Sequence, residues 1–494
     1  MRGRSKSVVG QSEADKLMDD VLALRVAVLD EASGLIERFG GAAASPAIVN
    51  LAHYLCLRHH DLRAMQRRLM RHGLSSLGGL ESRTLPTIDA VLAMLGSLTG
   101  RPPPAPMTDE AEFFAGETRL VQATDTLFGP EPPHRRGRIM VTLPTEAAGD
   151  RAFVDDLARY GMDVARINCA HDDPATWRAM AANARTAGEA LGRRISVLMD
   201  IAGPKIRTGA VAVADGRPRL RIGDAFRLCA EGEPRLDADA SYAAGVSLAE
   251  MVNRLTVGDR VLYNDSKLEG VVESCGGGEA LIRVRRVKAG GLRLKPDKGL
   301  NLPDTALGLS PLTGKDHRDL ETAIECADMI GYSFVSHPDD IDLLEGLLPK
   351  VVAERRSLGL VAKIERPEAV RNLPDLIARA SGRRPLGVMI ARGDLAAEIG
   401  FERLAEMQEQ ILWVCEAAAV PVIWATQVLE SLVRDGTPSR AEMTDAAMAA
   451  RAECVMLNKG PAVCLGVQVL DGLLSRMDEH MFKKTPTLRA LKSW

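Results

Sequence analysis

Residues 360–426 decide the fold, and they read LVAKIERPEAVRNLPDLIARASGRRPLGVMIARGDLAAEIGFERLAEMQEQILWVCEAAAVPVIWAT. Three short apolar runs, rich in β-branched residues, lie at 360–365, 386–392 and 421–426. Between the last two, residues 402–418 place apolar side chains at helical spacing. Strands that alternate with helices form a parallel sheet, so this stretch predicts an α/β protein.

The same alternation extends outward over most of the chain. Five more strand-like runs lie at 138–143, 163–168, 195–200, 328–335 and 454–459. Further helical segments lie between them at 174–190, 338–356 and 440–452. Eight strand–helix units are the signature of a closed (β/α)8 TIM barrel, and a doubly wound open sheet is the alternative.

Two regions depart from this pattern and predict separate domains. Residues 1–130 read as an N-terminal helical domain, which could cover the barrel or mediate a homo-oligomer. Residues 209–301 consist of short apolar runs and Gly-rich turns, which predicts a small, all-β, barrel-like lid inserted after the third strand. The barrel would then comprise 137–208 and 302–485, with the lid at its C-terminal mouth.

The composition excludes several classes of protein. The 494 residues carry 63 basic and 66 acidic side chains, a balance that argues against a nucleic-acid partner. Apolar residues make up 46% of the chain, as in globular proteins. The eight cysteines form no C-x-x-C pair, and the chain shows neither a signal-peptide pattern nor a run of about 18 apolar residues. We therefore expect reduced thiols, a cytoplasmic location and no membrane partner.

Polar residues follow the predicted strands at their C-terminal ends, where a barrel carries its active site. They are Arg166, Asn168, Asp200, Lys205, Arg207, Lys363, Glu365, Arg392, Gly393, Asp394 and Thr426. Glu365 and Asp394 follow adjacent strands and offer the oxygen donors that Mg²⁺ prefers. With cations beside a metal, such a site suits phosphoryl transfer or the stabilisation of an enolate.

Each of these residues taken alone has a simpler interpretation. A single Asp or Lys after a strand is more often a helix cap or an ion-pair partner. The concentration of cations, carboxylates and a hydroxyl at the same end of six strand–helix junctions favours a functional site.

Six motifs resemble, in order, those of the pyruvate kinase family. GMDVARINCAH (161–171) is similar to the family's GMNVARLNFSH, and it is followed by MDIAGPKIRTG, DKGLNLP, AKIERPEAV, MIARGDLAAEI and WATQVLESLVRDGTPSRAEMTDAAMA. The resemblance covers roughly residues 137–460. It implies a barrel with an inserted lid. It also implies a reaction, dependent on Mg²⁺ or Mn²⁺, in which phosphoenolpyruvate and ADP give pyruvate and ATP.

The resemblance implies catalytic and metal-binding roles for four residues. Lys363 would neutralise the phosphoryl group in flight and stabilise the pyruvate enolate. Arg166 would bind the phosphate of the substrate. Glu365 and Asp394 would hold the divalent metal, and Asp394 would also adjoin the substrate.

Further roles concern the substrate carboxylate and the nucleotide. Gly393 and Thr426 would contact the substrate near its carboxylate, with Thr426 close to the path of the proton that the enolate takes up. The residues that the resemblance assigns to the nucleotide are Asn168, His171, Arg207, Lys298 and Asp265. Lys298 and Asp265 belong to the lid.

One departure from the family pattern concerns K⁺, which many members bind through Asn, Ser, Asp and Thr. Asn168 and Asp200 remain here, but Ala170 and Ile201 stand at the Ser and Thr positions. Lys205 replaces the Glu of the family's GPEIRTG, as in the K⁺-independent branch. We expect the Lys205 ammonium to stand in for the monovalent cation, so that K⁺ is not required; a solvated loop lysine is the alternative.

Other departures affect the acceptor side and the ends of the chain. Residues 458–461 read NKGP where the family has SGET, which could alter the choice of nucleotide or acceptor. The first strand continues into VTLPTE, so the family's nucleotide-side proline would be Pro144. The chain ends about 30 residues after the last strand, so the family's C-terminal regulatory domain is expected to be missing.

Two rival hypotheses remain beside the kinase. In one, the phosphoenolpyruvate site serves a different acceptor, or lyase or decarboxylase chemistry on the pyruvate enolate. In the other, the protein is a non-catalytic metabolite sensor whose function lies in the N-terminal helices. The retention of Lys363, Glu365, Asp394 and Thr426 argues against the sensor.

Overall fold

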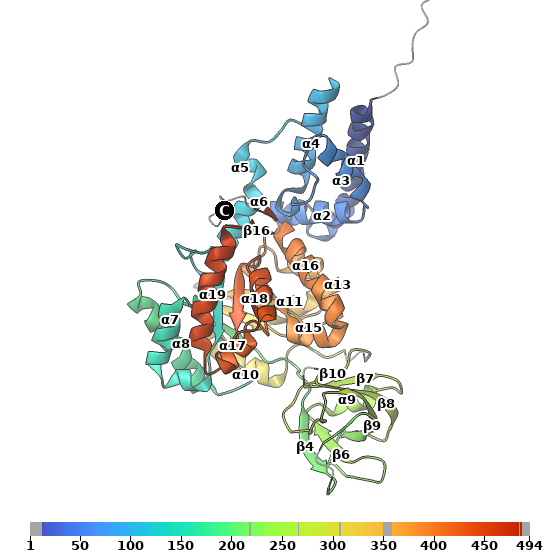
Figure 1. Ribbon diagram of the computed structural model, residues 1–494, viewed down its shortest axis with the longest axis vertical. Helices are drawn as coiled ribbons and strands as arrows, with labels where there is room; N and C mark the ends of the chain where they lie inside the picture. The colour runs from blue at the N-terminus through green and yellow to red at the C-terminus, as the bar shows by residue number, and fades with distance from the viewer. Residues whose placement is uncertain are drawn as a thin grey trace, which may run out of the picture.

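The computed structural model describes residues 12–216, 219–264, 266–305, 308–348, 358–483 and 485–486. These residues form three regions along one long axis, with N-terminal helices at one end, a barrel in the middle and a small β domain at the other end (Figure 1). No helix among them combines the length and the apolar character needed to cross a bilayer.

Eight parallel strands close the central barrel. Their bounds are Arg138–Thr142 (β1), Val164–Asn168 (β2), Ser196–Asp200 (β3), Met329–Tyr332 (β11), Gly359–Ile364 (β12), Leu386–Ala391 (β13), Val422–Ala425 (β14) and Cys454–Leu457 (β15). Around the barrel they follow the order β1, β15, β14, β13, β12, β11, β3 and β2. Each strand overlaps one of the eight predicted runs, so the (β/α)8 barrel is confirmed and the open sheet is wrong.

Helices between the strands form the outer layer of the barrel. They are α7 (Arg151–Tyr160), α8 (Pro174–Ala190), α10 (Gly314–Cys326), α11 (Pro338–Leu347), α13 (Pro367–Arg371), α14 (Leu373–Ala380), α15 (Arg392–Ile399), α16 (Phe401–Ala417), α17 (Glu430–Asp435), α18 (Arg440–Ala449) and α19 (Val463–Asp478). A 3-10 turn (η3, Thr145–Ala148) precedes α7, and a short hairpin of β16 (Met481–Phe482) and β17 (Thr485–Pro486) follows α19. Of the helix predicted at 338–356, residues 349–356 lie outside the described part of the chain.

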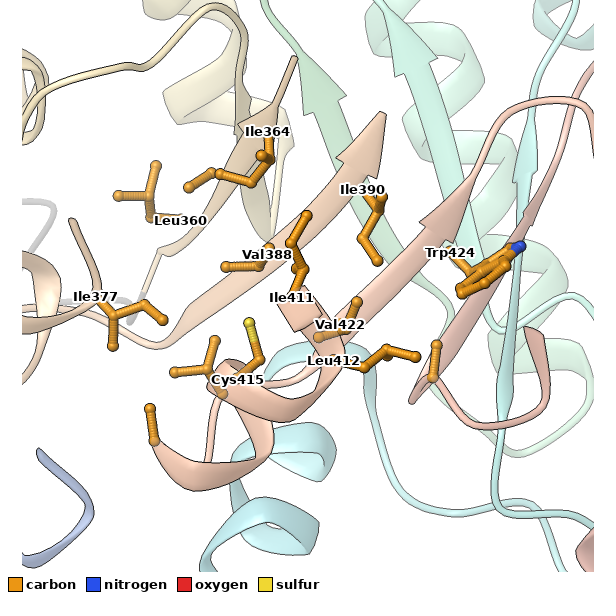
Figure 2. Close-up of a cluster of buried hydrophobic side chains, with 14 of the residues drawn as sticks. Leu360, Ile364, Ile377, Val388, Ile390, Ile411, Leu412, Cys415, Val422 and Trp424 are labelled. Carbon is orange, nitrogen blue, oxygen red and sulfur yellow. The ribbon is translucent and has the colours of Figure 1, made fainter. Parts of the chain in front are cut away.

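Apolar side chains join these helices to the barrel wall. Ile411, Leu412 and Cys415 of α16 belong to one buried cluster with Val388 of β13 and Val422 of β14 (Figure 2). Burial of such side chains contributes about 1.5–3 kcal/mol each, and it holds the strands that end at the mouth of the barrel.

The end of α6 (Ala115–Phe128) closes the N-terminal end of the barrel. Leu127 and Phe128 share one buried cluster with residues of the strands, namely Met140, Val164, Leu198, Met329, Val361, Met389, Ile423, Ala425, Cys454 and Met456. A Cβ atom on Gly359 or Gly387, at the starts of β12 and β13, would lie 2.5 Å from the Leu127 side chain. These two glycines therefore leave room for the Leu127 side chain at this end of the barrel.

Further helices precede α6 and pack beside the barrel. They are α1 (Glu13–Arg38), α2 (Pro46–Arg58), α3 (Arg63–Arg71), α4 (Thr84–Thr99) and α5 (Glu110–Phe113), with 3-10 turns η1 (Gly41–Ala43) and η2 (Glu81–Arg83). α1 packs on α2 and α4, and α2 packs on α16 of the barrel. Asn50 of α2 donates to the carbonyl of Ala417 at 2.8 Å, which fixes the N-terminal helices to the C-terminal end of α16.

The segment between β3 and α10 folds into a separate sheet with its own core. Its strands are β4 (Thr208–Val213), β5 (Ala225–Cys229), β6 (Tyr242–Val246), β7 (Arg260–Tyr263), β8 (Leu268–Gly276), β9 (Glu279–Val287) and β10 (Leu300–Asn301), in the order β10, β7, β8, β9, β5, β6, β4. The expectation of an all-β lid is wrong at α9 (Ala249–Arg254). Met251 and Val252 bury themselves in the lid core from this helical turn, and their spacing from Leu248 and Leu255 is helical.

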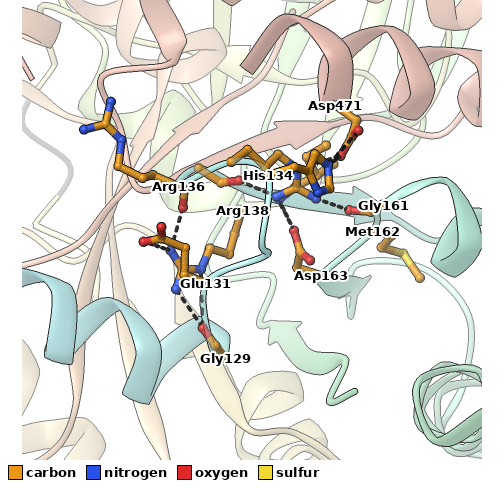
Figure 3. A network of polar contacts seen from close by, with 12 residues as sticks. Gly129, Glu131, His134, Arg136, Arg138, Gly161, Met162, Asp163 and Asp471 are labelled. Carbon is orange, nitrogen blue, oxygen red and sulfur yellow. Dashed lines mark hydrogen bonds and ion pairs between the residues drawn. The ribbon is translucent and has the colours of Figure 1, made fainter. Parts of the chain in front are cut away.

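Buried charges tie the strand starts together at the N-terminal end of the barrel (Figure 3). Arg135 donates to Asp471 at 2.7 Å, to Asp163 at 2.8 Å and to the carbonyl of Gly161 at 2.6 Å. Asp163 also accepts from the backbone N–H of Ile139 at 2.8 Å. This cluster links α19 to β1 and to the residue before β2.

Candidate active site

A cavity of about 100 Å³ lies at the C-terminal ends of the barrel strands. Its walls are formed by Arg166, Asn168, Ala170, Asp200, Ile201, Ala202, Lys205, Arg207, Ser333, Phe334, Lys363, Glu365 and Asp394. Eight of the polar residues singled out in the sequence at the strand ends therefore meet around one space: Arg166, Asn168, Asp200, Lys205, Arg207, Lys363, Glu365 and Asp394.

Asp200 at the end of β3 organises the floor of the cavity. Arg166 of β2 donates to one oxygen of Asp200 through both Nε, at 3.0 Å, and Nη2. Lys363 of β12 lies 3.1 Å from the other oxygen. Thr142 of β1 accepts from the second Nη of Arg166 at 2.9 Å. Residues of four strands, β1, β2, β3 and β12, thus hold the Arg166 guanidinium and the Lys363 ammonium in fixed positions.

The Lys363 ammonium is charged at neutral pH. Its Nζ lies 2.9 Å from Glu365 and donates to Ser333 Oγ at 2.7 Å. Burial alone would lower the pKa of Lys363, but the carboxylates of Asp200 and Glu365 outweigh it and raise the pKa above its ordinary value. Lys363 can therefore stabilise negative charge, and it cannot serve as a base at neutral pH.

The two carboxylates expected to hold a metal lie on the same side of the cavity. Glu365 accepts from the backbone N–H of Phe334 at 2.7 Å, which fixes one of its oxygens. Burial raises the pKa of Glu365, the Lys363 ammonium opposes this rise, and the nearby Asp394 adds to it. For Asp394, burial raises the pKa, but the attraction of Lys205 outweighs burial and leaves the pKa below its usual range.

This donor set fits Mg²⁺ or Mn²⁺. No group of three or more His, Cys, Asp and Glu side chains in the described part of the chain could hold a metal on its own. Mg²⁺ is bound in many enzymes by one or two carboxylates together with substrate oxygens and water, and Glu365 and Asp394, which both line the cavity, meet that requirement.

Lys205 reaches into the cavity from the loop after β3. Its Nζ contacts both oxygens of Asp394, at 2.9 and 3.1 Å. The predicted alternative, a lysine free in solvent, does not describe this side chain, because it is ion-paired and about three-quarters buried.

Gly393 and Thr426 lie together beside Asp394. The backbone N–H of Gly393 donates to Thr426 Oγ at 2.8 Å. Thr426 has a φ of 65°, in the left-handed region that a β-branched residue seldom adopts, and such strain clusters at functional sites. Arg392 holds this turn in place because it donates to the Thr426 carbonyl at 2.6 Å and pairs with Asp445.

Of the residues assigned to the nucleotide, Asn168 and Arg207 line the cavity. Asn168 accepts from the backbone N–H of Ala170 at 3.1 Å, and Arg207 donates to the carbonyl of Asp297 at 3.2 Å. His171 follows β2, and burial together with the cations Lys459 and Arg207 lowers its pKa. Lys298 precedes β10 in the lid, and Asp265 lies outside the described residues.

Sequence reasoning missed Ser333 and Phe334 as site residues. Ser333 directly follows β11, contacts Lys363 and donates to the Ile201 carbonyl at 2.7 Å. Phe334 has a φ of 59° and supplies the N–H that holds Glu365. The only signal in the sequence was a hydroxyl at the end of the fourth strand, at the level of the other site residues.

A second cavity, of about 360 Å³, opens between the lid and the barrel. Lys205, Phe334 and Asp394 line both cavities. Asn301 at the end of β10 donates to Glu398 of α15 at 3.1 Å, so the lid is hydrogen-bonded to the barrel beside the site. The site thus lies where two domains meet, an arrangement that suits a lid able to close over a substrate.

Fold and site together define a class of protein: (β/α)8 barrel enzymes with a β domain inserted after the third strand and a site of paired cations and carboxylates at the mouth. The family profile "Pyruvate kinase, barrel domain" matches residues 134–464, which is most of the chain. The chain belongs to the pyruvate kinase family.

Named relatives agree with this assignment. A pyruvate kinase of Mycobacterium intracellulare is 34% identical over 66% of this chain and 65% of its own length. One of Mycobacterium tuberculosis is 33% identical over 71% of this chain and 72% of its own. The crystal structure of a pyruvate kinase from Cryptosporidium parvum superposes with a TM-score of 0.61 and 27% identity, over 72% of this chain and 73% of that one. The chain thus spans about two-thirds of the length of the relatives it matches.

Proposed function

We propose that this protein transfers the phosphoryl group of phosphoenolpyruvate to ADP and releases pyruvate and ATP. The observation that carries the proposal is the buried Lys363 ammonium, which borders a cavity together with Arg166, Glu365 and Asp394. A charged lysine beside two metal-binding carboxylates is suited to negative charge that moves from a phosphate to an enolate. Membership of the pyruvate kinase family supports the choice of substrates.

The reaction moves a phosphoryl group from one oxygen to another and then protonates the enolate with a proton drawn from water. The bond between the phosphorus and the enol oxygen of phosphoenolpyruvate breaks, and a bond from phosphorus to a β-phosphate oxygen of ADP forms. Arg166 binds the transferring phosphoryl group. Lys363 holds the enol oxygen as it becomes an enolate, which then takes up a proton on its terminal carbon. Removal of one such preorganised charge typically costs about 10²–10³ in rate.

Glu365 and Asp394 would hold Mg²⁺ or Mn²⁺. Bound there, the metal would supply a Lewis acid that neutralises the phosphate and enolate oxygens. The Phe334 N–H keeps Glu365 in place, and the strained turn at Thr426 places a hydroxyl beside Gly393 and Asp394. That hydroxyl lies close to where the substrate carboxylate and the proton path are expected. We also propose that the protein acts in the cytoplasm, where these substrates occur.

We further propose that Lys205 makes K⁺ unnecessary. Its ammonium lies beside Asp394 and lines the cavity with Asn168 and Asp200, so a fixed positive charge occupies the side where K⁺ would act. Lys205→Gln should lower the rate of pyruvate formation about 10–10²-fold without K⁺. Added K⁺ should restore part of the loss in the variant and leave the unaltered protein unchanged. Strong K⁺ stimulation of the unaltered protein would contradict this role.

The function itself is tested by following pyruvate and ATP together. The purified protein is incubated with phosphoenolpyruvate and Mg²⁺, with and without ADP, in buffer that contains K⁺. Pyruvate and ATP in equal amounts, formed only with ADP, support the kinase. Pyruvate formed without ADP indicates a different acceptor, and no turnover under either condition contradicts an enzymatic role on this substrate.

A further inference from the structure

The loop after β15 is held firmly at the mouth of the barrel. A Cβ atom on Gly460 would lie 2.6 Å from Val433 Cγ1 and 2.7 Å from the Val433 carbonyl oxygen, so only glycine allows this approach to α17. The backbone N–H of Ala462 donates to that same carbonyl at 2.9 Å. Lys459, the residue before Gly460, therefore has a fixed backbone at the rim of the site.

The Lys459 side chain is exposed and makes no hydrogen bond or ion pair with any residue that the structure describes. Its charge is nevertheless close enough to act on His171, whose pKa is lowered first by burial, then by Lys459 and Arg207, and to a smaller extent by Arg166. Asp172 acts in the opposite direction, and it already accepts from Thr145 at 2.7 Å. Lys459 and Arg207 thus approach the same imidazole from β15 and from the start of the lid.

This rim differs from the floor of the cavity in its balance of charge. On the floor, Lys363 lies between Asp200 and Glu365, and Lys205 lies against Asp394. On the rim, Lys459 has no carboxylate partner among the described residues, and the Arg207 guanidinium donates to the backbone carbonyl of Asp297. An excess of cations beside a cavity attracts a polyanion and raises its local concentration.

We propose that Lys459 binds the diphosphate of ADP and sets the affinity of the enzyme for its nucleotide. This inference rests on the proposed function and adds a residue from the eighth strand–helix loop to the nucleotide site. A lysine ammonium is a compact charge on a flexible stem, which suits it to a phosphate that arrives from solvent. The substrate phosphate of phosphoenolpyruvate, held at Arg166, is not the partner of Lys459.

The test compares Lys459→Met, Lys459→Arg and a control, Lys16→Met, on the exposed face of α1 at the far end of the molecule. The KM for ADP is measured at saturating phosphoenolpyruvate, and the KM for phosphoenolpyruvate at saturating ADP. Lys459→Met should raise the KM for ADP about tenfold, as expected for one charge-assisted hydrogen bond, with kcat and the other KM little changed. Lys459→Arg should retain most of the affinity. Because exposed charges are screened, the tenfold difference should shrink as salt rises from about 0.02 to about 0.3 M.

Other outcomes overturn the inference. An unchanged KM for ADP in Lys459→Met, or an equal rise in both KM values, shows that Lys459 is not a nucleotide residue. If the unaltered protein has no activity, the proposed function fails, and the binding of Mg²⁺–ADP is then measured by calorimetry on the same proteins. Weaker binding in Lys459→Met alone supports the inference without the reaction, and equal binding in all variants overturns it.

Discussion

Buried cations meet carboxylates at both ends of the barrel, but the two clusters are built differently. At the N-terminal end, each nitrogen of Arg135 donates to a protein acceptor, either Asp163, Asp471 or a backbone carbonyl (Figure 3). At the mouth, each side-chain nitrogen of Arg166 likewise donates to Asp200 or Thr142, but Arg166 and Lys363 also border a cavity. The same residue types hold the fold together where protein encloses them, and they can bind a ligand where they border open space.

The largest effect is expected when a charge at the barrel mouth is removed, and an active variant would contradict the comparison. Lys363→Met should lower kcat by about 10³ because the developing enolate loses its fixed counter-charge. The variant should still fold, since Arg166 continues to neutralise Asp200. Circular dichroism and thermal unfolding serve as controls. Turnover within tenfold of the unaltered protein would contradict the assigned role of Lys363.

The next largest effect is a loss of stability, which we expect when the ion pairs at the N-terminal end of the barrel are broken. Arg135→Met leaves Asp163 and Asp471 without their buried partner. The free energy of unfolding should fall by about 3–5 kcal/mol, the usual result of breaking a buried ion pair from one side. The kcat per folded molecule, assayed at low temperature, should stay unchanged. A large loss of kcat in the folded variant would show that the two ends are coupled.

The smallest expected effect is a change in the pKa of His171 at the cationic rim of the cavity. The pKa of His171 lies below its ordinary value of 6.5 because of burial and of the positive charges of Lys459 and Arg207. A bound polyanion should raise this pKa, since it favours the charged imidazolium. An NMR titration, with His171→Gln to assign the signal, should show the midpoint rise on addition of Mg²⁺–ADP. A midpoint unaffected by the nucleotide would place the diphosphate elsewhere.

Most of the fold could be predicted from the sequence because apolar residues are spaced differently in strands and in helices, and the two patterns alternate along the chain. The eight runs coincide with the eight strands, and the residues after them meet at the mouth because parallel strands point the same way. The turn at α9 was missed because a six-residue helix leaves little periodicity among short strands.

The sequence predicted which residues lie at the site, but it did not predict which of their side chains contact one another. That Glu365 and Asp394 converge follows from their strands, but the contact of Lys205 with Asp394 joins a loop residue to the first turn of α15, 189 positions away. The closed cluster around Arg135 was not foreseen, because Arg135 and Asp471 look like ordinary surface charges in the sequence. That Lys459 finds no partner among the described residues is likewise a property of the folded protein and not of the sequence pattern.

The measurement that tests the account most directly is ATP formation from phosphoenolpyruvate, ADP and Mg²⁺ in buffer free of K⁺ and NH₄⁺, with the unaltered protein and Lys363→Met side by side. We expect ATP from the unaltered protein and about 10³-fold less from the variant. No ATP from the unaltered protein, even after K⁺ is added, would contradict the assignment of the cavity at the barrel mouth as a pyruvate kinase site.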